Sequence, residues 1–314
     1  MAQNWHSDIL GGEFEMRYVN QGYGYNEGVR CTLVRLLASE NKGRAVVYIH
    51  GFNDYFFQSE MAERFVAQGY NFYAVDLRNY GRSIMKGQRK FDIRSMNEYF
   101  PDVDSVLTAA RRGGNYEIVL MGHSTGGLLA SYYLACNSAA PVDALILNSP
   151  FLDWNLGWKE HLVPFVSALG RVFPNMSVPQ GDSDIYSQSL LRSKHGEWNF
   201  NTDWKLPVSP DVTTGWVRAI DQAQDYLHHH KYSINVPVLL MYSSASSNPE
   251  QWGSEASCTD IVLDVKDIRH YGMMLGRNVT PVVVKGGIHD LVLSKPMLRN
   301  ALYKYMFEWL EAVK

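Results

Sequence analysis

Short apolar runs alternate with amphipathic segments along most of the chain. Unbroken runs rich in Val and Ile are typical of strands that are covered on both faces. These runs lie at residues 45–49, 70–76, 116–121, 143–148, 236–242 and 281–285. Two earlier segments, 12–19 and 29–37, are also strand-like and predict an antiparallel pair. Alternating strands and helices indicate an α/β fold with a mostly parallel sheet and helices on both faces.

Helical periodicity follows several of the predicted strands. Phe57, Met61 and Phe65 share one helical face, and Gly69 is placed to end that helix. Pro296 suits the first turn of a C-terminal helix. Further helical patterns lie at residues 99–112, 125–137, 260–274 and 296–313.

A long mixed segment, residues 151–232, interrupts this alternation. It holds five of the eight tryptophans, namely Trp154, Trp158, Trp198, Trp204 and Trp216. A plain connection between two sheet strands is rarely this long. We therefore predict a core of residues 1–150 and 233–314, with residues 151–232 inserted as a cap over the carboxyl edge of the sheet.

The composition excludes some classes of partner and site. The formal net charge is -3 and no basic patch dominates, so we expect no nucleic-acid partner. Cys31, Cys136 and Cys258 are too far apart for a zinc site or a disulfide framework, which favours reduced thiols. We find no signal-peptide pattern and no apolar run near the ~20 residues that span a bilayer. The expected location is the cytoplasm.

The strongest chemical signal is the sequence Gly-His-Ser-Thr-Gly at residues 122–126. It follows a predicted strand and precedes a predicted helix, which is the context of a G-x-S-x-G nucleophile elbow. Small residues are needed on both sides of a serine at so tight a turn. The helix N-terminus behind Ser124 favours developing negative charge. Ser124 is the predicted nucleophile.

A serine hydroxyl needs a base, and the base in turn needs an acid that orients it. In this class the order along the chain is serine, acid, histidine. His289 stands in the turn after the last predicted strand, and Asp260 follows the long loop after the strand before it. Asp153, after strand 143–148, is the alternative acid. We predict Ser124, Asp260 and His289 as the catalytic triad.

An oxyanion hole needs two N–H donors aimed at one point. One donor should be the backbone N–H of Thr125, the residue after the nucleophile, and the other should come from the loop after strand 45–49. We assign the second donor to Phe52 and give His50 a structural role. Phe52 and His123, with the cap residues Trp154 and Trp158, are the predicted substrate pocket, which should be largely apolar.

Several motifs recur together in one known family. They are His50-Gly51-Phe52, Asp76 to Ser83 (D-x-R-x-x-G-x-S), Gly122 to Gly127, Thr259 to Val262, and Gly287-Ile288-His289. The chain resembles the monoacylglycerol lipase and lysophospholipase-like α/β hydrolases, a group also called serine aminopeptidase-like. The resemblance covers about residues 28–150 and 233–313. Residues 243–259 look like an insertion relative to that family.

The resemblance implies hydrolysis of a small-molecule carboxylic ester through an acyl-enzyme, with no metal and no organic cofactor. Monoacylglycerols, lysophospholipids and short-chain acyl esters are the expected substrates. An aminopeptidase of the same fold is an alternative, and it would need a cap carboxylate such as Glu160, Asp182, Asp184 or Glu197 to hold the substrate amine. A perhydrolase or acyltransferase using the same residues, and a non-catalytic binding protein, are further alternatives.

An apolar patch in the predicted cap has two interpretations. Its members are Leu162, Val163, Phe165, Val166, Leu169, Val172 and Phe173. They predict either a helix packed on the body, which we favour, or a surface that contacts a membrane.

Overall fold

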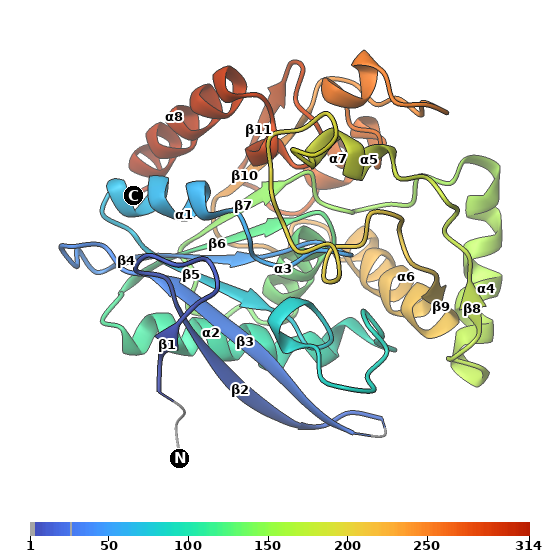
Figure 1. The fold of residues 1–314 in the computed structure, drawn as a ribbon, viewed down its shortest axis with the longest axis horizontal. Helices are drawn as coiled ribbons and strands as arrows, with labels where there is room; N and C mark the ends of the chain where they lie inside the picture. The colour runs from blue at the N-terminus through green and yellow to red at the C-terminus, as the bar shows by residue number, and fades with distance from the viewer. Residues whose placement is uncertain (1–3, 26) are drawn as a thin grey trace.

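A nine-stranded mixed sheet forms the centre of the protein, as seen in a computed structural model that describes residues 4–25 and 27–314 (Figure 1). The strand order is β1-β2-β3-β5-β4-β6-β7-β10-β11. The first pairings, β1 with β2, β2 with β3 and β3 with β5, are antiparallel, and the rest are parallel. This is the α/β-hydrolase architecture that the motifs predicted.

The strands of the sheet are β1 (His6–Ser7), β2 (Glu15–Tyr23), β3 (Gly28–Leu36), β4 (Arg44–Ile49), β5 (Asn71–Asp76), β6 (Glu117–His123), β7 (Ala144–Asn148), β10 (Val238–Ser243) and β11 (Val279–Val284). The helices are α1 (Ser59–Ala67), α2 (Phe100–Arg112), α3 (Thr125–Cys136), α4 (Val163–Val172), α5 (Ile185–Leu190), α6 (Thr214–His229), α7 (Val265–Gly272) and α8 (Pro296–Ala312). A separate pair, β8 (Ser177–Val178) with β9 (Val212–Thr213), lies outside the sheet.

Alternating side chains of the central strands build two separate cores. In β4, Val47 and Ile49 face the core that contains the buried faces of α2 and α3, whereas Val46 and Tyr48 face the core that contains α1 and α8. All four side chains are fully buried. Because both faces of β4 are covered, its sequence is continuously apolar rather than alternating. The carboxyl ends of these strands are the edge at which the site forms.

The predicted elements agree with the structure except near their ends. The antiparallel pair of early strands is confirmed, although β2 ends at Tyr23 rather than at residue 19. The helix predicted over residues 260–274 begins only at Val265. The Asp264 side chain accepts a hydrogen bond from the Lys266 N–H as the N-cap, so residues 260–264 lie outside the helix.

Four elements of the segment between β7 and β10, namely α4, α6, β8 and β9, lie together at one end of the sheet, whereas α5 lies apart from them (Figure 1). We call residues 151–232 the inserted segment. Its helix α4 packs closely on α6. At the contact, a β-carbon added to Gly170 would lie only 2.2 Å from the Thr214 carbonyl oxygen, so only glycine fits there. The opposite side of α4 leaves Phe165 71% exposed and Val172 67% exposed. The covered face of the predicted apolar patch therefore packs on α6 of the same segment, and the opposite face is exposed.

No helix in the two described stretches of chain is both long enough and apolar enough to cross a bilayer.

Candidate active site

Ser124 occupies a strained turn between β6 and α3. Its backbone has φ 52° and ψ -118°, in the region where a non-glycine residue costs roughly 1–3 kcal/mol. The Ser124 N–H donates to the Asn148 carbonyl at 3.0 Å, and the Ser124 carbonyl accepts from Gly127, Leu128 and Phe151. These bonds hold the residue at the N-terminus of α3.

The glycines of the elbow are required by the space around them. A β-carbon at Gly122 would lie 2.5 Å from the Gly126 carbonyl oxygen, and one at Gly126 would lie 2.3 Å from the His50 carbonyl oxygen. Neither approach leaves room for a methyl group, and both neighbours are backbone atoms. The glycines at both ends of the motif thus let α3 pack directly against the end of β4.

His289 and Asp260 form a buried pair at the same edge of the sheet. His289 Nδ1 lies 2.9 Å from Asp260 Oδ2, and both side chains are almost completely buried. The other carboxylate oxygen, Oδ1, accepts from the Val262 and Leu263 N–H groups at 2.8 Å each. An ionised carboxylate held this way fixes the Nδ1–H tautomer of the imidazole and leaves Nε2 free to act as a base.

The predicted alternative acid lies elsewhere. The charged or polar neighbours of Asp153 are Tyr271 and Asp267 of α7, rather than His289. The geometry therefore favours Asp260 as the partner of the histidine.

The loop after β4 approaches the nucleophile closely. A β-carbon at Gly51 would lie 3.1 Å from Ser124 Cβ. Within the described residues, the Phe52 N–H has no hydrogen-bond acceptor, and Thr125 is the first residue of α3, where N–H groups have no intrahelical acceptor. These two N–H groups are the ones predicted to hold an oxyanion.

His50 has the structural role that its position predicts. Its Nδ1 lies 2.8 Å from the Gly51 carbonyl, and its Nε2 accepts from the Leu77 N–H at 3.1 Å. This pattern requires the neutral Nδ1–H tautomer. Burial lowers the pKa of His50, which keeps the ring in that form.

A cavity of about 130 Å³ brings these groups together. Ser124, His289, His123 and Phe52 line it from the core. The inserted segment contributes Ser183, Tyr186, Ser187, Lys205, Leu206, Pro207 and Ser209. Several serines and Lys205 lie among these residues, but the greater part of the cavity wall is apolar, as predicted.

The two tryptophans predicted for the pocket lie outside this lining. Trp154 packs its ring against Phe151 and Trp216, with ring centroids 5.2 Å and 6.2 Å away. Trp158 is 73% exposed on the outer surface. The prediction is wrong for both because an aromatic side chain in an irregular segment gives no periodic signal of the side it faces.

A buried charge cluster stands beside the nucleophile. Lys205 Nζ lies 3.1 Å from Asp54 Oδ1, and His123 Nδ1 lies 3.9 Å from Asp54 Oδ2 and 4.0 Å from Asp290 Oδ2. Burial and the nearby His289 lower the pKa of His123 well below its usual value, so the ring is neutral. Burial raises the pKa of Asp290, whose oxygens accept from the side-chain amides of Asn148 and Gln58.

Asp54, His123 and Asp290 place possible metal-ligand atoms within 4.8 Å of one another. The Lys205 ammonium already faces Asp54 from the inserted segment. A second cation would be repelled by it, so we assign no metal to this cluster.

The segment after β5 is a buried ionic network rather than a simple loop. Arg82 donates to both Asp76 and Asp8 at 2.7–2.8 Å, and Arg78 makes a two-bond contact with Asp102. The Ser83 hydroxyl donates to the Asp76 carbonyl at 2.7 Å. Asp76, Arg78 and Ser83 of the D-x-R-x-x-G-x-S motif all belong to this network, which holds the segment after β5 in place.

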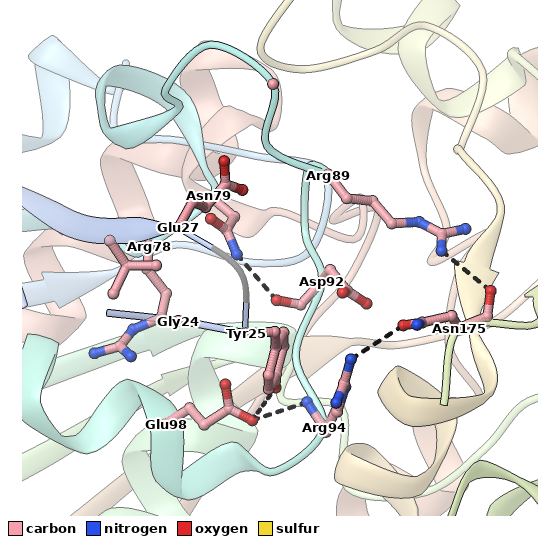
Figure 2. A pocket seen from close by; sticks show the side chains of 12 residues that line it. Gly24, Tyr25, Glu27, Arg78, Asn79, Arg89, Asp92, Arg94, Glu98 and Asn175 are labelled. Atoms are coloured by element: carbon pink, nitrogen blue, oxygen red, sulfur yellow. Dashed lines mark hydrogen bonds between the residues drawn. The ribbon is translucent and has the colours of Figure 1, made fainter. Parts of the chain in front are cut away.

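A larger cavity, about 400 Å³, lies away from the triad (Figure 2). Figure 2 shows Arg89 and Arg94 reaching Asn175 of the inserted segment, at 3.2 Å each. Arg78 and the three carboxylates Asp92, Glu27 and Glu98 line the same cavity, so its positive and negative charges balance. It contains none of the predicted catalytic residues.

Sequence reasoning missed several groups at the candidate site. Lys205, Asp54, Asp290 and Asn148 were not singled out, yet all lie beside Ser124 or His289. Asp290 and Asn148 each had a detectable signal, since one follows His289 directly and the other ends a buried strand. Lys205 had none, because it comes from an irregular stretch far along the chain.

The chain is similar to curated lipases over part of its length. It is 29% identical over 145 residues to the monoacylglycerol lipase of Mycolicibacterium smegmatis, which covers 46% of this chain and 50% of that protein. It is 28% identical over 137 residues to phospholipase YtpA of Bacillus subtilis, covering 43% and 51% respectively. The chain thus spans about half the length of the curated relatives it matches.

Solved structures share the fold over nearly the whole chain. The monoacylglycerol lipase of Paleococcus ferrophilus superposes with a TM-score of 0.65 at 20% identity and covers 90% of this chain and 99% of that one. A soluble variant of the monoglyceride lipase of Saccharomyces cerevisiae, in complex with a substrate analog, gives 0.68 at 14% identity, covering 98% and 99%. At these identities the likeness concerns the fold.

The family model described as Hydrolase_4, serine aminopeptidase, S33, matches residues 40–295. That range runs from β4 through the elbow to the turn that carries His289. The chain belongs to this family of α/β hydrolases.

Proposed function

We propose that the protein is a serine hydrolase that cleaves carboxylic esters through an acyl-enzyme on Ser124. The observation that carries this proposal is the convergence on one cavity of Ser124, at a positive-φ elbow, and His289, paired at 2.9 Å with buried Asp260. A binding protein would have no need for a strained serine beside an oriented histidine. Membership of a hydrolase family supports the same conclusion.

The residues of the cavity divide the reaction into two steps. Ser124 Oγ attacks the ester carbonyl while His289 Nε2 takes its proton, and the N–H groups of Phe52 and Thr125 hold the oxyanion. The carbon–oxygen bond to the alcohol then breaks, and His289 returns the proton to the leaving oxygen. Water activated by His289 attacks the acyl-enzyme and releases the acid and Ser124.

The size of the cavity supports a small substrate. Its volume of about 130 Å³ is below the roughly 300–1,000 Å³ typical of sites for drug-sized ligands. Ser183, Ser187 and Ser209 stand among apolar side chains in its wall. We infer that short acyl esters, or esters of a small polar alcohol, fit better than long-chain esters. Monoacylglycerols and lysophospholipids with short acyl groups are members of this class.

The charges at the site favour esters over peptides with a free amine. None of the four carboxylates predicted to hold an amine lines the cavity: Glu160 accepts from Leu156, Asp184 accepts from Gln188, Glu197 pairs with Arg299, and Asp182 is exposed. The charged side chain that the inserted segment does supply is Lys205. An ammonium group next to another ammonium group would be repelled.

The experiment is p-nitrophenol release from a chain-length series of p-nitrophenyl esters, with wild type and Ser124→Ala. We expect turnover that is highest for short acyl groups and absent from the variant. Aminoacyl p-nitroanilides serve as the parallel series for the aminopeptidase alternative. Turnover of the anilides but not of the esters would overturn the proposal.

The cytoplasmic location stays a prediction of the sequence.

A further inference from the structure

The loop that supplies one oxyanion donor is bound to the inserted segment through three consecutive residues. Asn53, Asp54 and Tyr55 directly follow Phe52, and each contacts the stretch 201–206. This contact joins parts of the chain about 150 residues apart in sequence. It is a separate feature from the triad, whose residues come from other loops.

Asn53 makes the most specific of these contacts. Its side-chain NH₂ donates to the Leu206 carbonyl at 2.8 Å, and its side-chain oxygen accepts from the Leu206 N–H at 2.8 Å. One amide thus satisfies both backbone groups of one residue, as a neighbouring strand would. We call this two-bond contact the Asn53 clamp.

The backbone of Asn53 explains why asparagine suits this position. Its φ is 48°, in the left-handed region that disfavours most side chains and that Asn tolerates best after Gly. Glycine would fit the backbone but has no side chain for the clamp. Asparagine satisfies both requirements at once.

The contacts on either side of the clamp strengthen the same attachment. Lys205 pairs with Asp54 at 3.1 Å, and the Tyr55 hydroxyl accepts from the Asn201 N–H at 2.8 Å. The Phe52 ring itself packs against Trp216 of α6, with centroids 4.9 Å apart. The loop therefore has the inserted segment, rather than solvent, along its outer side.

These contacts matter because an oxyanion donor acts only when it is held in advance. Removing one such donor costs about 10²–10³ in kcat, and small displacements of positioned groups are also costly. The Phe52 N–H is followed at once by the clamped residue, so the clamp limits how far this peptide rotates. The segment that covers the site then also sets the geometry of its chemistry.

We propose that Asn53 is a positioning residue that locks the oxyanion loop to residues 201–206, so that this part of the inserted segment belongs to the catalytic machinery rather than to a freely lifting lid. The inference rests on the proposed function of Ser124. It predicts that losing the clamp slows the chemical step and leaves ground-state binding largely intact.

The test is Asn53→Gly, which keeps the left-handed backbone and removes both clamp bonds. The probe is an alkyl fluorophosphonate, with which Ser124 Oγ forms a bond to phosphorus as fluoride leaves and His289 takes the proton. Its phosphoryl oxygen occupies the oxyanion hole whatever the natural ester is. We expect the maximal inactivation rate and kcat for the best ester to fall about tenfold or more. KM should change less than about threefold.

Two further variants separate positioning from a general loss of structure. His195→Ala breaks a different contact of the inserted segment, its stacking on Trp252 at 3.6 Å, and should leave both rates within about twofold of wild type. Asn53→Asp keeps the acceptor for Leu206 N–H, loses the donor and adds a negative charge near the oxyanion, so its rates should fall at least as far as those of Asn53→Gly. It also serves if Asn53→Gly fails to fold.

Each result has a distinct meaning. Wild-type labelling that is lost in Ser124→Ala supports the proposed function. An unchanged inactivation rate in folded Asn53→Gly, or an equal loss in His195→Ala, would then overturn the clamp alone. Wild type that neither reacts with the probe nor turns over any ester overturns the proposed function and this inference with it.

Discussion

Asp260 lies directly beside Ala245, with its backbone N–H 2.9 Å from the Ala245 carbonyl, although residues 246–259 separate them in sequence. Ser247 N–H in turn donates to the Asp260 carbonyl at 3.0 Å. The chain thus leaves the end of β10, makes a long excursion and returns to the same place. Asp260 therefore lies next to the end of β10, where a short loop would also place it. The predicted insertion at residues 243–259 does not change this position.

The Asp260 carboxylate should be required for rapid turnover. Asp260→Asn should lower kcat for ester hydrolysis about 10⁴-fold, because an amide at this position stabilises the wrong tautomer of His289. The matched control is Asp264→Asn, since Asn replaces Asp well as the N-cap of α7. The measurement is kcat for both variants at the pH of maximal activity. Equal activity in the two variants would show that Asp260 is not the acid.

His123 should make the fold sensitive to mild acid. Burial lowers its pKa in the folded protein below the ordinary value of 6.5, so the unfolded chain binds a proton that the folded chain does not. The contribution of the neutral His123 ring to the free energy of unfolding is therefore fully present above pH 6.5, and it is lost as the pH falls. From about pH 7.5 to about pH 5.5 the loss should be about 1.4 kcal/mol.

The check is urea unfolding of wild type and His123→Asn across this pH range. The variant should lose less free energy of unfolding on acidification, whatever its stability at neutral pH. His161→Asn is the control, because His161 is exposed. Parallel pH profiles for wild type and His123→Asn would contradict the prediction.

Lys205 and Asp54 should depend on one another for stability. Their side chains are 8% and 1% exposed, so removing one leaves the other as a buried, unpaired charge. Lys205→Met should lower the free energy of unfolding by about 3–5 kcal/mol, and adding Asp54→Asn should restore much of it. A double-mutant cycle by chemical denaturation measures this coupling.

The matched control for this cycle is Lys304→Met. Lys304 pairs with Glu308 on the surface of α8 with its side chain 77% exposed, and the change should stay within about 0.5 kcal/mol. Additive effects of Lys205→Met and Asp54→Asn would mean that the two charges do not compensate each other.

Trp252, in the loop of residues 243–259, should stabilise the inserted segment. Its ring stacks on His195 at 3.6 Å, at the C-terminal side of α5. Trp252→Ala should cost about 1 kcal/mol and speed hydrogen exchange in residues 185–198 more than in the central sheet. The control is Trp158→Ala, where the side chain is 73% exposed. Uniform exchange in both variants would show that the stacking has no local effect.

The sequence alone determined the central sheet and the elbow because both follow from local rules. A strand buried on both faces must be continuously apolar, as in β4, and a serine at so tight a turn requires Gly122 and Gly126. The order of serine, acid and histidine along the chain then pointed to Asp260 and His289, whose side chains lie 2.9 Å apart. Each of these inferences needed only neighbouring residues and the connectivity of one fold.

Only the tertiary structure decided what surrounds Ser124. The Lys205–Asp54 pair and the Asn53 clamp join positions about 150 residues apart, within segments that have neither helical nor strand periodicity. Trp154 and Trp158 lie outside the lining of the cavity for the same reason. In such segments the direction of a side chain is set by packing against distant parts of the chain, and that packing leaves no repeating pattern in the sequence.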